Sequence, residues 1–164
     1  MEGKNPFITK HKERDNLTKD PYENLLNGIR FYWGPFYRAN PHRFVLDYFQ
    51  INIHPFQQFL IYEIDKSEQS TIIATRGLGK SWILAVYACT RAVLYPRSNI
   101  LVAAKRKKQA KLLITSKIMD DLYKKSEALR REIKSLQNNN NEVKIEFWNG
   151  SIIEAVVSND DSRG

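Results

Sequence analysis

The residues best placed to do chemistry form a short run, Gly79-Lys80-Ser81, which follows an apolar segment at Ser70–Ala74. A glycine lets the backbone approach a ligand closely, a lysine supplies a compact positive charge, and a serine hydroxyl can coordinate a metal ion. Between a strand and a helix, this order is typical of a loop that holds a nucleoside triphosphate and Mg²⁺. The sequence therefore predicts an ATP site, with Lys80 on the β- and γ-phosphates and Ser81 on Mg²⁺.

The loop departs from the usual phosphate-loop pattern at its first position, where Ala74 stands in place of a glycine. Gly77 restores backbone freedom inside the loop. Arg76 either reaches the γ-phosphate and stabilises transition-state charge, or pairs with a carboxylate at the surface. The residues expected to contact the nucleotide are Thr75, Arg76, Gly77, Leu78, Gly79, Lys80, Ser81 and Trp82.

Strands and helices are expected to alternate around this loop. Ser70–Ala74 is a short β-branched run, Lys80–Tyr95 has the apolar composition of a buried helix, and Asn99–Ala104 is typical of an interior parallel strand. A basic helix is expected over Lys107–Lys125 and a shorter one over Glu127–Leu136. The order strand, helix, strand, helix predicts a parallel sheet with right-handed crossovers.

Helices are expected before this region and a hairpin after it. Asp20-Pro21 begins a helix that Gly34-Pro35 should end, and further helices follow Asn40-Pro41 and His54-Pro55. Val143–Phe147 and Ser151–Val157 alternate at period two around Asn149-Gly150, which predicts the hairpin. The residues expected on the inner faces of the three helices are Leu25, Leu26, Ile29 and Tyr32, then Phe44, Val45, Tyr48 and Phe49, then Phe56, Phe59, Leu60 and Ile64.

The positive charge is concentrated in one block. Residues 75–136 carry 15 lysines and arginines against 4 acidic residues, whereas the whole chain has a net charge of +8. Such a block predicts a polyanionic partner whose binding is sensitive to salt, and the alternative is a solvated, lysine-rich helix face. The single cysteine, Cys89, excludes an internal disulfide, and the longest apolar run, Trp82–Thr90, is too short to span a bilayer. An intracellular protein without a membrane partner is expected.

The run from Ala74 to Ser81 resembles the deviant phosphate loop of phage terminase large subunits, which carry a small residue first and an arginine third. Further segments resemble that family in the same order, from about Asn40 to Gly164. They are His54-Pro55-Phe56-Gln57-Gln58 (a segment whose glutamine contacts adenine), Ile100–Lys105 with Gln109-Ala110 (the following strand and helix), Phe147–Ser151 (the hairpin) and Ser158–Gly164 (a Ser-Arg-Gly loop).

This resemblance implies a P-loop NTPase of the ASCE type, with an incomplete α/β parallel sheet, flanking helices, an N-terminal helical segment and a β-hairpin near the C-terminal end. Residues 1–50 would be a leader and helical collar, and residues 51–164 the N-terminal part of the ATPase domain. By position, Gln57 or Gln58 would recognise adenine and Arg76 would be an arginine finger acting in cis. The implied activity couples ATP hydrolysis to the movement of double-stranded DNA into a procapsid. The implied partners are double-stranded DNA, a portal protein, a terminase small subunit and further copies in a ring, in the cytoplasm of the host.

Two other functions fit the same residues. A DEAD-like helicase, or another nucleic-acid-dependent P-loop ATPase, shares the upstream glutamine, the phosphate loop and the basic second half. A truncated remnant without enzymatic activity would bind nucleic acid or phosphate through Lys105-Arg106-Lys107-Lys108. The Walker B aspartate, the catalytic glutamate and the nuclease acids that the terminase resemblance calls for are absent from the sequence. We therefore expect the chain alone to bind ATP and to hydrolyse little of it.

Overall fold

The computed structural model describes residues 20–139 and 143–157. The chain divides into two compact units, Met1–Phe36 and Tyr37–Gly164. The expected leader at residues 1–19 and the Ser-Arg-Gly loop at residues 158–164 lie outside the described residues. Across the described residues, no helix combines the length and the apolar run that crossing a bilayer requires.

The N-terminal helical segment begins where the sequence predicts and ends later. The Asp20 carboxylate accepts a hydrogen bond from the Tyr22 N–H at 2.9 Å, so the expected N-cap is confirmed. Helix α1 spans Pro21–Gly28, the π-helical turn η1 spans Ile29–Trp33, and α2 spans Gly34–Ala39. The expected stop at Gly34-Pro35 is wrong, because a proline in the first turn of α2 needs no hydrogen-bond partner for its nitrogen.

The apolar face expected on this first helix is not buried. The four side chains are between 43% and 64% exposed, because an apolar stripe is covered only where another element packs on it. They are Leu25, Leu26, Ile29 and Tyr32.

Helices α3 (Pro41–Asp47) and α4 (Pro55–Lys66) follow the expected Asn-Pro and His-Pro starts. In and after α3, the expected inward residues Phe44, Val45 and Phe49 are buried. The expected face of α4 is partly wrong, since Phe56 and Phe59 are 47% and 65% exposed. Helix α4 instead buries the residues one turn apart on its other side, Gln57 and Ile61.

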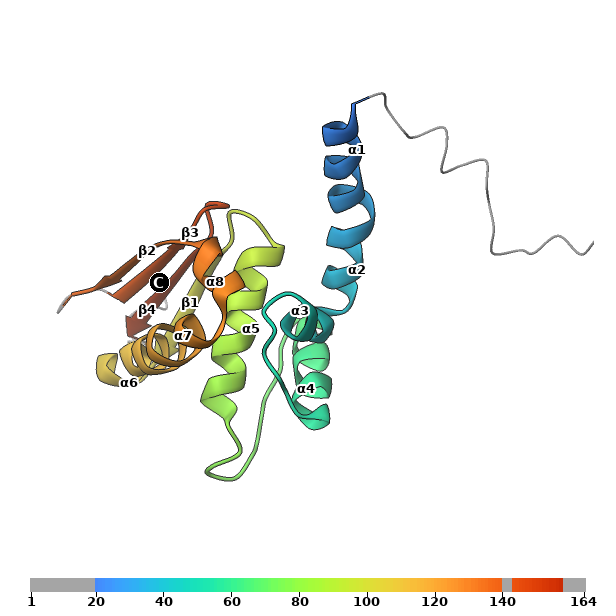
Figure 1. The fold of residues 1–164 in the computed structure, drawn as a ribbon. Coiled ribbons are helices and arrows are strands. Elements are labelled where there is room, and N and C mark those ends of the chain that lie inside the picture. The colour runs from blue at the N-terminus through green and yellow to red at the C-terminus, as the bar shows by residue number, and fades with distance from the viewer. Residues whose placement is uncertain (1–19, 140–142, 158–164) are drawn as a thin grey trace, which may run out of the picture. The chain divides into compact units, whose positions relative to one another are not determined.

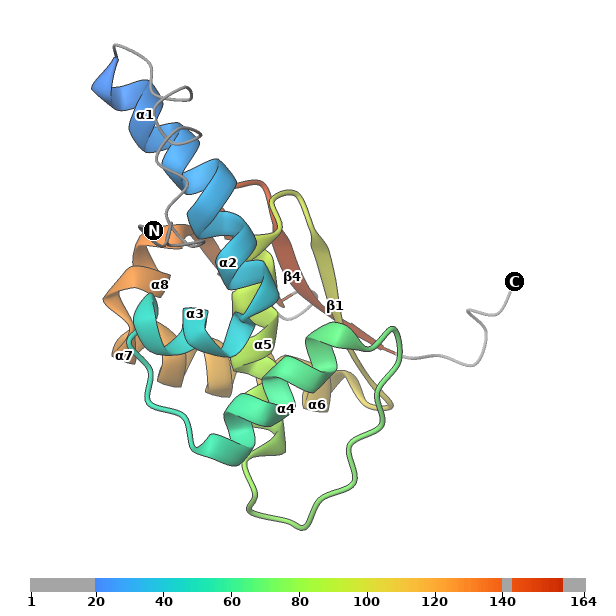
Figure 2. The same ribbon diagram turned by 90° about the vertical axis from the view of Figure 1, so that its right-hand side faces the viewer.

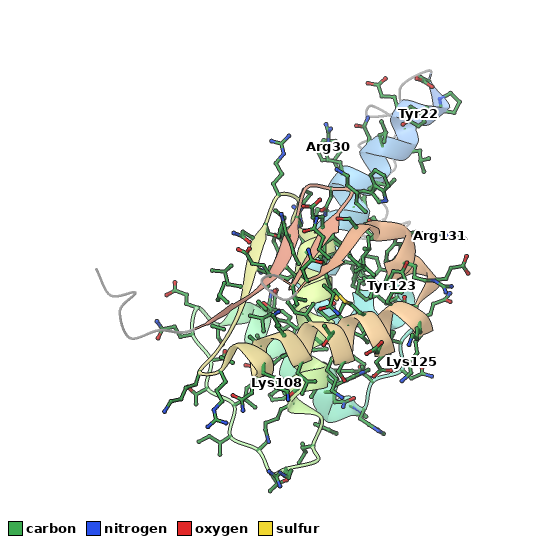
Figure 3. The ribbon with its side chains drawn as sticks, turned by 90° about the vertical axis from the view of Figure 1, so that its left-hand side faces the viewer. Tyr22, Arg30, Lys108, Tyr123, Lys125 and Arg131 are labelled. Carbon is green, nitrogen blue, oxygen red and sulfur yellow. The ribbon has the colours of Figure 1, made fainter. Side chains whose placement is uncertain are left out.

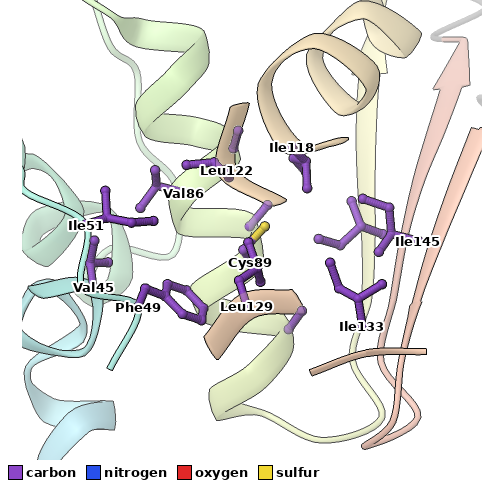
Figure 4. Close-up of a cluster of buried hydrophobic side chains, with 14 of the residues drawn as sticks. Val45, Phe49, Ile51, Val86, Cys89, Ile118, Leu122, Leu129, Ile133 and Ile145 are labelled. Carbon is purple, nitrogen blue, oxygen red and sulfur yellow. The ribbon is translucent and has the colours of Figure 1, made fainter. Parts of the chain in front are cut away.

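Helix α5 (Lys80–Leu94) is the centre of the second unit, as its apolar composition predicts. In Figure 4, Cys89 of this helix lies with Phe49 and Ile51 on one side and with Ile133 and Ile145 on the other. The pKa of the Cys89 thiol is raised by its complete burial. Cys89 is therefore a small packing residue and not a reactive thiol.

The sheet contains four strands in the order β1-β4-β3-β2 (Figure 1). Strand β1 (Asn99–Ala104) pairs parallel with β4 (Ile152–Val157), and β3 (Val143–Phe147) pairs antiparallel with both β4 and β2 (Ile133–Asn138). The expected parallel pairing is therefore present between β1 and β4, but the same sheet also contains antiparallel strands, because a turn as short as the one between β3 and β4 can join only antiparallel strands. The expected hairpin at residues 143–157 is confirmed.

Three strand assignments differ from the sequence-based expectation. The segment 70–74 forms neither helix nor strand and pairs with none of the described strands, so the expected strand before the loop is wrong. Strand β1 lies at an edge of the sheet and not in its interior. Helix α8 (Glu127–Glu132) gives way to β2 at Ile133, because pairing with β3 supplies hydrogen bonds that override the helical pattern.

The basic helix at residues 107–125 is confirmed, but its middle is wider than an α-helix. It consists of α6 (Lys107–Leu112), the π-helical η2 (Leu113–Leu122) and α7 (Tyr123–Lys125). Four buried residues recur at a strict spacing of four, and an ideal α-helix would rotate each by about 40° relative to the last. The wider turns of a π-helix rotate less per residue about the helix axis than those of an α-helix. This offsets the drift and leaves the row on the side of α5. The row is Ala110, Ile114, Ile118 and Leu122.

Candidate functional site: the loop before helix α5

The loop that leads into α5 contains two glycines in the left-handed backbone region. Gly77 and Gly79 have φ values of 93° and 78°, a conformation that side-chain-bearing residues rarely adopt. Gly79 is the N-cap of α5, and no side chain caps this helix end. The first N–H groups of α5 therefore remain available at the loop, where the helix dipole favours an anion.

Lys80 is held over this loop by the loop's own backbone. Its ammonium group donates hydrogen bonds to the carbonyl oxygen of Ala74 and, at 2.7 Å, to that of Thr75. The charge is thereby held at the start of the loop, at the carbonyl oxygens of Ala74 and Thr75. The sequence alone singles out Lys80 as a candidate binding residue. The two carbonyl oxygens that accept its hydrogen bonds become apparent only from the fold of the loop.

The other expected ligand-binding residues lie on the same loop and differ in exposure. Arg76 and Ser81 are exposed, which leaves the guanidinium and the hydroxyl accessible from solvent. Trp82 is half-buried and packs against the core, so it supports the first turn of α5 more than it faces the loop. The remaining expected contacts are exposed at Thr75, Gly77 and Leu78.

The two glutamines expected to read adenine occupy different positions. Gln57 is 8% exposed, its Oε1 accepts from the His54 N–H at 2.9 Å, and its Nε2 lies 3.7 Å from where a Cβ of Gly79 would be. Gln58 instead donates from Nε2 to the Ile53 carbonyl oxygen at 3.2 Å. The structure therefore brings Gln57 to the phosphate loop, while Gln58 is tied to the chain before α4.

We expect Gln57→Ala to lower the free energy of unfolding by about 1–2 kcal/mol, because the substitution removes a buried hydrogen bond and leaves the His54 N–H without its partner. Urea denaturation measures the effect. Gln58→Ala is the matched control and should cost less, since its bond is longer and more exposed. Equal losses in the two variants would contradict the special position of Gln57.

An ion pair that the sequence does not predict joins helix α4, which precedes the loop, to helix α5, which follows it. The side chain of Asp65 in α4 is 6% exposed and accepts from Arg91 at 3.0 Å and from the Tyr87 hydroxyl at 3.1 Å. Burial, followed by the nearby Asp65 charge, raises the pKa of Tyr87 to about 12, so Tyr87 stays a neutral donor. Helices α4 and α5 are thus joined, and the loop between them has anchored ends.

The basic residues that follow β1 lie toward the end of the sheet at which α5 begins (Figures 1 and 3). Lys105, Arg106 and Lys108 are exposed, and within the described ranges no carboxylate pairs with them. At the other end of this helix, Lys124 and Lys125 form ion pairs with acidic residues one turn earlier. Lys105, Arg106 and Lys108 thus form a group of exposed cations toward the side of the loop before α5.

The fold and the loop together define a mixed α/β protein with a glycine-rich turn, a lysine and a helix N-terminus at one site. A family model described as RNA cytidine acetyltransferase NAT10/TcmA, helicase domain, matches residues 71–161, which is more than half of the chain. The chain belongs to this helicase-domain family. No curated protein matches it.

This match shows that the assignment to the phage terminases is wrong. The portal protein and the terminase small subunit were expected as partners on the basis of that resemblance alone, and the comparisons give no support for either. The error has a physical origin, because a glycine-lysine-serine loop, an upstream glutamine and a basic second half serve ATP-driven proteins of several kinds. The helicase alternative, which rests on the same residues, agrees with the family.

Proposed function

We propose that the chain is the nucleotide-holding part of a helicase-like, nucleic-acid-dependent ATPase. The observation that carries this proposal is the helicase-domain match, which includes both the loop at Ala74–Ser81 and the basic residues after β1. The cradle of Gly77, Gly79 and Lys80 fits a triphosphate in charge and in backbone geometry.

Each residue of the loop has a defined task in this proposal. Lys80 would neutralise charge on the β- and γ-phosphates, and the N–H groups of the first turn of α5 would hold phosphate oxygens. The Ser81 hydroxyl would be a ligand of Mg²⁺, which supplies charge neutralisation when it is bound. Arg76 is exposed on the loop and would stabilise charge that develops on the γ-phosphate. Gln57 beside Gly79 would contact the adenine base.

The nucleic-acid partner in this proposal is RNA, because the description of the matching family names an RNA-modifying enzyme. The side chains proposed to hold its phosphates are Lys105, Arg106 and Lys108, which lack a carboxylate partner among the described residues. Phosphate contacts of this kind contribute affinity without reading sequence.

The test is the salt dependence of single-stranded RNA binding. Three phosphate contacts on a single strand should weaken binding about 20-fold between 50 and 200 mM salt, since log K falls with log salt by about 0.7 per contact. Fluorescence anisotropy with a labelled oligonucleotide measures this slope. Replacing Lys105, Arg106 and Lys108 together by alanine should lower the slope by about 2.

A matched triple variant controls for net charge. Lys124, Lys125 and Arg131 are also exposed cations, but each is paired with an acidic residue one turn earlier. Their joint replacement by alanine should leave the slope nearly unchanged. Equal effects of the two triples would mean that net charge alone attracts the RNA. Tighter binding of a DNA strand of the same sequence would overturn the choice of RNA.

A further inference from the structure

The turn that joins β3 to β4 holds an exposed tryptophan. Trp148, directly after β3, is 68% exposed, whereas Trp82 is half-buried against the core. The backbone of the turn is fixed, because the Trp148 N–H donates to the Glu132 carbonyl oxygen at 3.0 Å and the Asn149 side chain is bonded to the end of α5. An indole held at a defined surface position offers a flat apolar face on which another ring can stack.

Two exposed cations lie at this turn. The Lys134 Nζ is 6.0 Å from the centroid of the Trp148 ring. Arg97 lies beside the turn, since a Cβ on Gly150 would be 3.4 Å from the Arg97 Cγ. Figure 1 and Figure 2 both show the connection between α5 and β1, which contains Arg97, next to the turn between β3 and β4. Arg97 has a φ of 61°, which is uncommon for a residue with a side chain.

The carboxylates around these cations are engaged elsewhere. The pKa of Glu146 is lowered mainly by the hydrogen bond that Lys144 donates at 2.8 Å, and less by the charge of Lys134. Glu132 accepts from a tyrosine hydroxyl of the segment after α3. No described carboxylate lies within ion-pairing distance of Arg97 or Lys134. The turn therefore combines positive charge with an open aromatic face.

We propose that the turn between β3 and β4 binds single-stranded RNA, with one base stacked on the Trp148 indole and the neighbouring phosphates on Lys134 and Arg97. Aromatic rings beside cations hold single strands without reading sequence, because every base has a π face and every linkage a negative charge. The bases of a duplex are already stacked, so the site selects unpaired RNA. The choice of RNA rests on the proposed function. The new contact lies at the opposite end of β1 from Lys105.

Binding of a labelled oligouridine of about eight nucleotides, followed by anisotropy without ATP, tests the proposal. Uridine is chosen because it cannot enter a site for adenine. Trp148→Ala should weaken binding about tenfold through the loss of one stacked base, and Trp148→Phe less than about threefold, because a phenyl ring keeps a face for stacking. Neither variant should change the salt slope, since stacking releases no counterions. Lys134→Ala should instead lower the slope by about 0.7, one phosphate contact.

Tryptophan emission is the second readout, because a base stacked on an indole quenches its fluorescence. Oligouridine should quench the unaltered chain, and Trp148→Phe, which keeps Trp33 and Trp82, should not be quenched. Phe59→Ala is the matched control, since Phe59 is 65% exposed and no cation of the described residues lies over its ring. Equal weakening in Phe59→Ala and Trp148→Ala, or full quenching in Trp148→Phe, would overturn the proposal.

The two RNA contacts can fail separately. Binding that is lost in the triple variant of Lys105, Arg106 and Lys108 but unaffected in Trp148→Ala would overturn the stacking site and leave the proposed function standing. Binding that depends on Trp148 and not on that triple would support the stacking site and contradict the phosphate contacts after β1. A chain that binds no RNA would overturn both.

Discussion

Lys80→Ala is expected to weaken ATP binding about 100-fold. A hydrogen bond to a charged group contributes about 1.5–3 kcal/mol, and a tenfold change in affinity corresponds to about 1.4 kcal/mol. The Lys80 ammonium is held over the loop by the carbonyl oxygens of Ala74 and Thr75, so its position is set before ATP arrives. Calorimetric titration with ATP and Mg²⁺ measures the effect.

The matched control for this variant is Lys124→Ala. Lys124 is an exposed lysine whose ion pair with Asp120 spans 3.4 Å at the surface, and pairs of this kind contribute little. The affinity of the Lys124→Ala variant for ATP should equal that of the unaltered chain. If Lys80→Ala binds ATP as tightly as this control, and both chains melt at the same temperature, the loop at residues 74–81 is not the nucleotide site.

Phe44→Ala should lower the free energy of unfolding by about 3–5 kcal/mol, the range found when a buried aromatic residue is truncated. Phe44 is fully buried. The centroid of its ring lies 4.9 Å from the ring centroid of Phe49 and 4.8 Å from that of Tyr48. The truncation would leave a cavity where α3 packs on the core. Urea denaturation with a check for two-state behaviour measures the loss.

Phe56→Ala removes the same side chain from a position that is 47% exposed and serves as the comparison. Phe56→Ala should cost about 1 kcal/mol or less, because nearly half of the Phe56 surface is already exposed to water and less apolar contact is lost. A loss at Phe56 as large as that at Phe44 would mean that α4 is packed differently from the arrangement in the structure.

Sequence patterns predicted where helices begin and where the hairpin turns better than which faces are buried and which strands pair. The helix after the phosphate loop and the hairpin around Asn149-Gly150 follow from local signals that act over a few residues, and both were confirmed. The apolar face of Leu25 and Ile29 was wrong, because burial depends on a partner surface that helical spacing does not specify. Similarly, Ile133 continues into a strand because of pairing with β3, far along the chain.

The candidate site was only partly accessible from the sequence. The types and order of Gly79, Lys80 and Ser81 predict a phosphate-binding loop, and this stays a prediction. The approach of Gln57 to Gly79 and the anchoring of α4 by Asp65 could not be predicted, since both depend on how two helices cross. The family was misassigned because the same residue types occur in triphosphate-binding proteins with different functions.

The far end of α5 is also anchored, at the hairpin turn. The Asn149 side-chain amide donates to the carbonyl oxygens of Ala92 and Val93 at 2.7 and 3.1 Å, and the Ser151 hydroxyl donates to that of Tyr95 at 3.1 Å. A helix of this length extends roughly 22 Å. Helix α5 is therefore held at both ends, by these bonds near Leu94 and by the hydrogen bonds of the Lys80 ammonium to the loop backbone. Backbone order parameters should accordingly stay high from Lys80 to Leu94, so a ligand at the first turn of α5 would meet a segment that needs no further ordering.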